Sequence, residues 1–262
     1  MKKSIVLKLG GKTIEEDGVV EELVADLKAL PKFSPIVVHG GGSEIGRYLK
    51  LMGKEFSFIQ GLRITDVDIV EVVEMVLSGK INKNLVSRFQ RSGLRALGIS
   101  GKDMNLLQAT RYKKDGVDIG FVGEIIEVNT DLLNICASNQ ITPIVSPVSW
   151  GINGETYNVN ADHAALDIAR AVVCDEMVFI SDVPGIYREN GQTIRSLTPA
   201  LADKLIRAGE IKDGMIPKVR SALECLADGV RRVRIIGWKG PGTLLKELAS
   251  DNSIYGTVVI AE

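Results

Sequence analysis

The segment Pro35-Ile36-Val37-Val38-His39-Gly40-Gly41-Gly42-Ser43 is an apolar run that ends abruptly in three glycines. An apolar run of this length is typical of a buried strand, and the residues that follow it, 43–51, have the spacing of an amphipathic helix. A strand that leads through a glycine turn into a helix is the repeating element of α/β folds. The segment therefore predicts an α/β protein.

The same alternation of short apolar runs and amphipathic segments extends along the chain and predicts a mainly parallel open sheet covered by helices on both faces, a three-layer αβα sandwich. The predicted strands are Ser4–Leu9, Pro35–His39, Leu94–Ile99, Thr142–Ser146, Met177–Ser181, Arg232–Ile236 and Thr257–Ile260. The predicted helices are Asp17–Leu30, Ser43–Leu51, Asp66–Leu77, Lys80–Arg91, Thr130–Asn139, Ala161–Ala171, Thr198–Ala208 and Pro217–Asp228.

Three local patterns refine this prediction. The alternating segment Leu107–Val128, with a turn signal at Lys114-Asp115-Gly116, predicts a β-hairpin outside the parallel sheet. Thr65-Asp66-Val67-Asp68 resembles a capping box in which Asp replaces the usual Glu. Pro217 suits the first turn of a helix. No linker is evident, so we expect one continuous domain, 1–262, with an N-terminal lobe 1–171 and a C-terminal lobe 172–262.

Composition excludes several classes of protein. The chain has 262 residues, 45% hydrophobic and 25% charged, which is ordinary globular usage. Its formal net charge of −1 and its aromatic content of 5% give no support to nucleic-acid or anionic-membrane binding. Three scattered cysteines and two histidines show no metal-ligand spacing. We expect no resident metal site.

The N-terminus is not expected to be a signal peptide. Lys8 and Gly10-Gly11 interrupt its apolar stretch after a few residues, which is far too short for a membrane span. Cysteines that serve as small buried hydrophobic residues suit a reducing compartment. We therefore expect an intracellular, cytoplasmic protein.

The first candidate binding segment is Lys8-Leu9-Gly10-Gly11-Lys12, where a strand runs directly into glycines. Glycines at such a turn allow backbone N–H groups to approach a phosphate. Lys8 lies inside an apolar strand, so it either binds an anion or extends its ammonium group to solvent at the strand end. Val6 occupies the position of the first glycine of a P-loop, which excludes that motif.

The glycines after His39 indicate a second anion site at a helix N-terminus. The dinucleotide fingerprint fails there because Ile45 occupies the position of its third glycine. His39 itself is expected to be a hydrogen-bonded structural histidine. Arg63 could bind a carboxylate through its guanidinium fork, or it could simply be solvated at a helix start.

Further signals follow later strands. Asn158 could donate its amide to a substrate, whereas Asp162 could simply complement a helix dipole. Ser181-Asp182 lies at the carboxyl end of a predicted strand. Lys218 at a helix start is unfavourable unless an anion binds there, which favours a functional role. Because open parallel sheets bind ligands beyond the carboxyl ends of their strands, we expect these segments to converge.

In this order the segments resemble the amino acid kinase family, and within it the branch that phosphorylates N-acetylglutamate in arginine biosynthesis. The resemblance covers nearly the whole chain and includes Lys8–Gly11, His39–Gly42, Gly61–Thr65, Glu74–Asn84, Asn158–Ala165, Ser181–Gly185 and Asp213–Val219. It implies an ATP- and Mg²⁺-dependent kinase that phosphorylates the side-chain carboxylate of N-acetyl-L-glutamate.

The resemblance also implies residue roles. Lys8 and Lys218 would neutralise the transferring phosphoryl group, and Asp162 would hold both lysines. Nucleotide binding would use Lys8, Gly10, Gly11, Ser181, Asp182 and Lys218, with the nucleotide in the C-terminal lobe. Substrate binding would use Gly41, Gly42, Arg63 and Asn158. A carboxylate nucleophile with a pKa of about 4.3 is already ionised at neutral pH and needs no general base.

Alternatives remain within and outside this class. A kinase for carrier-protein-bound aminoadipate or glutamate usually has a DGDQ-type segment where this chain has Asn160-Ala161-Asp162-His163. A non-catalytic ligand-binding regulator would be expected to lack one of Lys8, Asp162 or Lys218. The segments Lys102–Asn105 and Asp118–Gly123 resemble a sub-branch in which some members accept N-succinylglutamate.

Assembly is predicted from one helix and one terminus. Arginine-inhibited hexameric members of the family carry an extra N-terminal helix, and only Met1-Lys2-Lys3 precede the first strand here. The helix Asp66–Leu77 is apolar around much of its circumference, which suits either an isologous dimer contact or burial within the monomer. We expect a homodimer without arginine inhibition.

Overall fold

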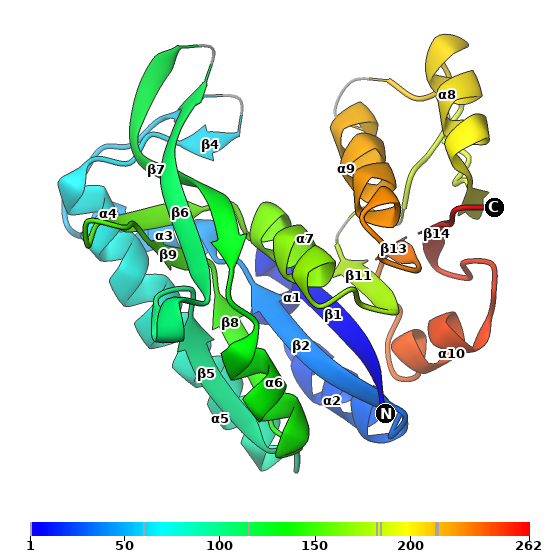
Figure 1. Ribbon diagram of the computed structural model, residues 1–262, viewed down its shortest axis with the longest axis horizontal. Coiled ribbons are helices and arrows are strands. Elements are labelled where there is room, and N and C mark those ends of the chain that lie inside the picture. The colour runs from blue at the N-terminus through cyan, green and yellow to red at the C-terminus, as the bar shows by residue number, and fades with distance from the viewer. Residues whose placement is uncertain (1, 60, 115, 182, 184, 213–214) are drawn as a thin grey trace. The chain divides into compact units, whose positions relative to one another are not determined.

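The computed structural model describes residues 2–59, 61–114, 116–181, 183, 185–212 and 215–262, without the side chains of Lys12 and Lys114. The chain divides into two compact units (Figure 1). Unit 1 comprises Met1–Pro35 and Ala169–Glu262, and unit 2 comprises Ile36–Ile168. The second boundary lies close to the expected one at residues 171 and 172, but residues 1–35 group with the C-terminal part of the chain.

Unit 1 is built on strands in the order β12-β14-β13-β11-β1. Strands β1, β11 and β13 are parallel, β14 is antiparallel to β13, and β12 is parallel to β14. The strands are β1 (Lys3–Leu9), β11 (Glu176–Ile180), β12 (Ser196–Leu197), β13 (Val233–Ile236) and β14 (Gly256–Val259). The helices are α1 (Gly11–Glu15), α2 (Val19–Lys28), α8 (Pro199–Arg207), α9 (Met215–Ala227) and α10 (Thr243–Ala249).

Unit 2 has a parallel set of strands in the order β2-β8-β5, against which α5 and α6 pack. A closed four-stranded sheet, β10-β7-β6-β9, and the short pair β3-β4 complete its strands. The strands are β2 (Phe33–His39), β3 (Phe58–Ile59), β4 (Leu62–Arg63), β5 (Ala96–Ser100), β6 (Leu107–Lys114), β7 (Val117–Val128), β8 (Thr142–Ser146), β9 (Val148–Trp150) and β10 (Thr156–Val159).

The described helices of unit 2 include a π-helix, η1. In chain order they are α3 (Gly42–Leu51), α4 (Val67–Glu74), η1 (Met75–Ile81), α5 (Asn82–Arg91), the 3-10 helix η2 (Asp103–Asn105) and α6 (Asp131–Ser138), while α7 (Ala161–Ala171) crosses the boundary at residue 168. Mostly parallel strands with helices against them confirm the predicted α/β class. The hairpin β6-β7 confirms the prediction for Leu107–Val128, although Asp115 of its turn lies outside the described residues.

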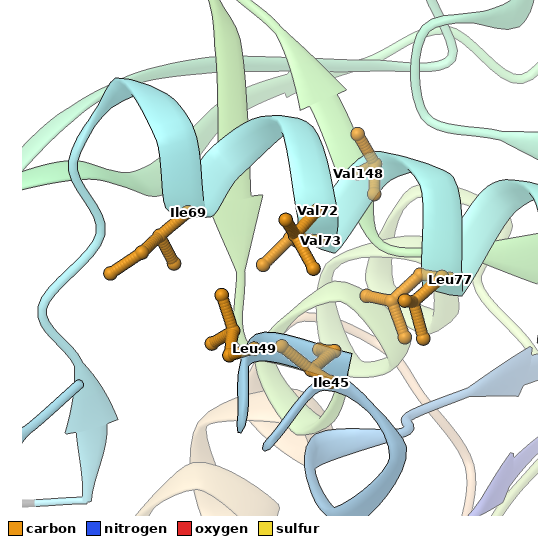
Figure 2. Close-up of a cluster of buried hydrophobic side chains, with 8 residues drawn as sticks. Ile45, Leu49, Ile69, Val72, Val73, Leu77 and Val148 are labelled. Carbon is orange, nitrogen blue, oxygen red and sulfur yellow. The ribbon is translucent and has the colours of Figure 1, made fainter. Parts of the chain in front are cut away.

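The core of unit 2 joins α3 to α4 and positions the glycine turn before α3. Figure 2 shows Ile45 and Leu49 of α3 facing Ile69, Val73 and neighbouring side chains of α4. All of these side chains are buried. Burying each large aliphatic side chain contributes about 1.5–3 kcal/mol, so this contact fixes the orientation of α3.

Two local predictions in this region were wrong. The helix break predicted at Ser78-Gly79 does not exist, because η1 continues α4 directly into α5. Ser78 is held there by a 2.7 Å contact between its Oγ and the Oγ of Ser146. The N-cap of α4 is Asp66 rather than Thr65, since the Asp66 carboxylate accepts from the backbone N–H of Ile69 at 2.8 Å.

Several short elements were not predicted from the sequence. Helix α10 and strand β10 follow glycine-rich sequence that carries little periodicity, and strand β9 has only three residues. Strand β10 depends on a partner that is remote in sequence, as in the parallel pairing of Asn158 with Val122. Pro217 lies in the first turn of α9, as predicted, although that helix begins at Met215.

Candidate active site

In unit 1, two neighbouring parallel strands end in the first candidate segment. Leu9 of β1 pairs with Ile180 of β11, and the next residue, Gly10, donates its backbone N–H to the Ile180 carbonyl at 3.2 Å. Lys8 is half-buried and pairs with Phe179 in the same register. Gly11 begins α1 directly after the strand. The structure therefore brings Lys8, Gly10 and Gly11 to the carboxyl ends of β1 and β11.

Ser181 lies at the same edge of this sheet. Its backbone N–H donates to the carbonyl of Ile236 at 3.0 Å, and its hydroxyl accepts from the backbone N–H of Val183 at 3.2 Å. Asp182, the other predicted nucleotide-binding residue of this segment, lies outside the described residues. Lys218 is half-buried in the first turn of α9, where the helix dipole favours an anion.

In unit 2, His39 shapes the glycine turn. It is fully buried, its Nδ1 lies 3.0 Å from the carbonyl oxygen of Gly40, and its Nε2 lies 3.1 Å from Nδ2 of Asn82. Burial lowers the pKa of His39 from 6.5 to about 4. The imidazole is therefore neutral at physiological pH, with Nδ1–H donating to Gly40 and Nε2 accepting from Asn82. This confirms the prediction of a structural histidine.

Gly41 and Gly42 form the start of α3. Gly41 is the N-cap, without a side-chain hydrogen bond, and Gly42 is the first helical residue. A Cβ on Gly41 would lie 2.2 Å from Cδ1 of Ile81 and 2.8 Å from Cδ2 of Leu77, whereas a Cβ on Gly42 would meet nothing within 4 Å. The π-helix η1 thus packs directly on the turn. The first N–H groups of an α-helix have no intrahelical partner, so a helix start of this kind can bind an anion.

A chain of hydrogen bonds links the predicted substrate residues. Nη2 of Arg63 donates to the carbonyl of Gly42 at 2.9 Å, and the Thr65 hydroxyl donates to the carbonyl of Arg63 at 2.7 Å. The amide of Asn158 donates to the Thr65 hydroxyl at 3.1 Å. Unit 2 therefore brings Gly42, Arg63 and Asn158 together. Thr65 was not predicted to be the link, because a threonine before a helix is common and carries no specific signal.

Arg63 is the least expected member of this group. Its side chain is 7% exposed, which excludes a merely solvated arginine, and burial lowers its pKa. Nη1 is buried and has no hydrogen-bond partner among the described residues. A buried guanidinium N–H without a partner costs free energy unless a ligand accepts from it. A carboxylate is the acceptor that best fits the guanidinium fork.

Asp162 is the second residue of α7. Its backbone N–H donates to the Asn160 side chain at 2.8 Å, and His163 donates to the same oxygen at 3.4 Å. Asn160 thus caps the helix with its side-chain oxygen. Within the described ranges, His, Cys, Asp and Glu side chains form no group of three that could hold a metal ion. The described helices include none with the length and apolar content to cross a membrane.

Comparison with known proteins identifies the family. The sequence pattern of the amino acid kinase family matches residues 3–237. The chain belongs to this family. It is 42% identical over 271 residues to the acetylglutamate kinase of Syntrophobacter fumaroxidans, a match that covers 98% of this chain and 90% of the other. The acetylglutamate kinase of Pelotomaculum thermopropionicum is also 42% identical and is covered to 92%.

Solved structures agree on the fold of this family member. A Streptococcus mutans structure matches with a TM-score of 0.80 and 27% identity over 100% of both chains. N-acetylglutamate synthase from Neisseria gonorrhoeae matches with a TM-score of 0.85 and 24% identity over 99% of this chain. This chain spans 60% of the length of the Neisseria protein. At 24% identity, the match to the Neisseria protein establishes only that the two proteins share a fold.

Proposed function

We propose that this amino acid kinase transfers the γ-phosphoryl group of ATP to the side-chain carboxylate of N-acetyl-L-glutamate, a step of arginine biosynthesis. Full-length similarity to acetylglutamate kinases supports the reaction. The observation in this chain that carries the proposal is Arg63, whose buried Nη1 has no partner among the described residues. The α-carboxylate of the substrate would supply one.

The chemistry needs positioning and charge stabilisation rather than a general base. The attacking carboxylate is ionised at neutral pH because its pKa is about 4.3. His39 is neutral, buried and hydrogen-bonded on both ring nitrogens, so it is unsuited to proton transfer. The obstacle is the repulsion between an anionic nucleophile and an anionic triphosphate, which cationic side chains and helix N-termini reduce.

We assign the catalytic roles accordingly. Lys8 and Lys218 neutralise the transferring phosphoryl group, and Asp162 orients the two lysines. Gly10, Gly11, Ser181 and Asp182 bind the nucleotide, which enters with Mg²⁺ as its substrate complex. The position of Lys8 and Gly10 at the carboxyl ends of β1 and β11 supports this assignment, since open parallel sheets bind ligands there.

Unit 2 is assigned to the acylated amino acid. Arg63 and Asn158 hold its α-carboxylate, and the turn of Gly41 and Gly42 holds the end of the substrate near the reacting carboxylate. The hydrogen-bond chain from Gly42 through Arg63 and Thr65 to Asn158 supports a single preorganised subsite. Unit 1 is correspondingly assigned to the nucleotide.

We also propose a homodimer that works in the cytoplasm. Most apolar residues of α4 and η1 are buried within unit 2, but Val67 and Met75 are 56% and 54% exposed and suit a contact between copies. All three cysteines are buried and none is in a disulfide, which fits a reducing compartment. Light scattering at working concentration should give the mass of two subunits, and a monomeric mass would refute the dimer.

The test of the activity is a coupled assay of ADP release with N-acetyl-L-glutamate, N-succinyl-L-glutamate and unacylated L-glutamate as separate acceptors. We expect turnover with the acetylated substrate at the highest kcat/KM. Trapping the acyl phosphate with hydroxylamine shows that phosphorylation occurs on a carboxylate. Turnover with another acceptor but not with N-acetylglutamate would contradict the proposal.

A further inference from the structure

The guanidinium of Arg63 lies in a corner formed by two aromatic rings. Its central carbon is 4.3 Å from the ring centroid of Phe56 and 4.6 Å from that of Phe58. The two ring centroids are 5.9 Å apart and the ring planes meet at 83°. Phe58 pairs with Arg63 across the short β3-β4 ladder, so the backbone register itself places one ring beside the arginine. We call Phe56 and Phe58 the aromatic corner.

Hydrogen bonds alone leave the orientation of this guanidinium incompletely fixed. Nη2 donates to the Gly42 carbonyl, while Nη1 has no partner among the described residues. A single hydrogen bond from Nη2 to a described residue constrains the guanidinium plane less than a bidentate contact would. Two ring faces at nearly a right angle leave the cation one favourable position, because a guanidinium is attracted to the face of an aromatic ring.

We infer that Phe56 and Phe58 are positioning residues that hold the Arg63 guanidinium so that Nη1 remains available to the carboxylate of the substrate. The inference rests on the proposed function in that Arg63 binds this carboxylate. The corner keeps the cation desolvated and oriented before the substrate arrives, which reduces the free energy lost on ordering the site. It adds two residues to the subsite that the sequence motifs did not contain.

The two rings differ in what else they do. Phe56 also packs against the core cluster of α3 and α4, and a Cβ on Gly46 of α3 would lie 3.2 Å from Cζ of Phe56. Its replacement therefore perturbs packing as well as Arg63. Phe58 is 54% exposed, so its removal costs little buried surface. Phe58 is the residue with which the inference can be tested cleanly.

The kinetic test uses Phe58→Leu, with Phe58→Tyr as the matched control that keeps the ring. We expect Phe58→Leu to raise KM for N-acetylglutamate by about three- to tenfold, as for the loss of one cation–π contact, while KM for ATP stays unchanged. Phe58→Tyr should retain the wild-type KM. In an Arg63→Lys background Phe58→Leu should add less than twofold, since the residue it positions is already altered.

A second readout does not depend on turnover. Ring currents from the corner shift the NMR resonance of the Arg63 Nε–H, and Phe58→Leu should move this resonance towards the value of a solvent-exposed arginine while the melting temperature stays within about 2 °C. Failure of wild-type protein to phosphorylate N-acetylglutamate would overturn the proposed function, and with it the substrate role of the corner. An active wild type with unchanged KM in Phe58→Leu would overturn the positioning role. So would an equal rise of KM in the Arg63→Lys background.

Discussion

Asn82 donates a hydrogen bond from Nδ2 to Nε2 of His39, 3.1 Å away, and so connects the start of α5 to the turn before α3. The same Nδ2 lies 2.8 Å from the carbonyl oxygen of Ile144 in β8. On its other side, His39 donates a hydrogen bond from Nδ1 to the carbonyl of Gly40. The shape of the glycine turn therefore depends on a buried, neutral histidine.

That histidine makes stability depend on pH. The pKa of His39 falls from 6.5 to about 4 on folding, so between these values the unfolded chain binds more protons than the folded one. The contribution of the neutral His39 to the free energy of unfolding is fully present above about pH 6.5. It is lost as the pH falls towards 4, and the free energy of unfolding then decreases by up to roughly 3 kcal/mol. Urea denaturation of wild type and His39→Gln across this pH range should show a smaller decrease in the free energy of unfolding for the variant.

His163 provides the control for this measurement, because it is exposed. His163→Gln should leave the loss of stability attributed to His39 in place between pH 6.5 and 4. If His39→Gln lost stability in parallel with wild type, the histidine would not be the titrating group.

The packing of η1 on the glycine turn predicts different effects of two neighbouring alanine substitutions. Gly41→Ala places a methyl group against Ile81 and the buried Leu77, and we expect a loss of about 1–3 kcal/mol. Gly42→Ala meets nothing within 4 Å and should not lose stability. Urea denaturation of both variants tests the difference. Equal losses would show that the contact of residue 41 with Ile81 and Leu77 does not determine the difference between the two positions.

The catalytic assignment predicts effects on turnover. Lys8→Ala and Lys218→Ala should each lower kcat by about 10²-fold or more, because each removes a charge positioned for the transition state. Asp162→Ala should also be severely impaired, since the two lysines would then be unoriented. Lys204→Ala, an exposed lysine of α8, is the control and should leave kcat unchanged. A change confined to KM in both catalytic-lysine variants would refute the assignment.

The assignment of unit 2 predicts a selective effect on one substrate. Arg63→Lys should raise KM for N-acetylglutamate much more than KM for ATP, since an ammonium group can reproduce neither the fork nor its fit between two rings. Initial rates with each substrate varied in turn measure both constants. Weaker ATP binding instead would place Arg63 at the nucleotide.

Periodicity predicted the parallel strands and most helices because these elements bury a regular apolar face. Ala161–Ala171 and Thr142–Ser146 have the predicted bounds. The prediction from periodicity was wrong at Ser78-Gly79. Local propensity favours a break there, but packing on Gly41 keeps the chain helical. Strand β10 could not be predicted, since its parallel partner β7 lies well before it in the sequence.

The candidate site was predictable in so far as it depends on glycines and charged residues in short motifs. The resemblance to the kinase family supplied the roles, and the structure supplied the neighbours. That Arg63 is buried between Phe56 and Phe58 could not be foreseen, because an arginine in the sequence is usually exposed. The connection from Asn158 through Thr65 likewise joins residues that are far apart in the chain.

A buried ion network predicts the largest loss of stability in unit 1. Arg234 of β13 is fully buried, with Nε 3.0 Å from Glu176 and Nη1 3.1 Å from Glu247, both buried. Arg234→Met would leave both carboxylates without this partner, and we expect a loss of about 3–5 kcal/mol. Glu247 also accepts the backbone N–H groups of Ile254 and Tyr255, so the loop before β14 should become more accessible to proteolysis.

Arg232 is the matched control for Arg234, because it also pairs with Glu176, at 3.4 Å, but its side chain is 26% exposed. Arg232→Met should cost less than about 1 kcal/mol, since its partner Asp251 is exposed to water and the buried Glu176 keeps its ion pair with Arg234. Urea denaturation of the two variants measures the difference. Similar losses would mean that burial of the Arg234 network does not determine its contribution, because each variant removes one positive charge that pairs with Glu176.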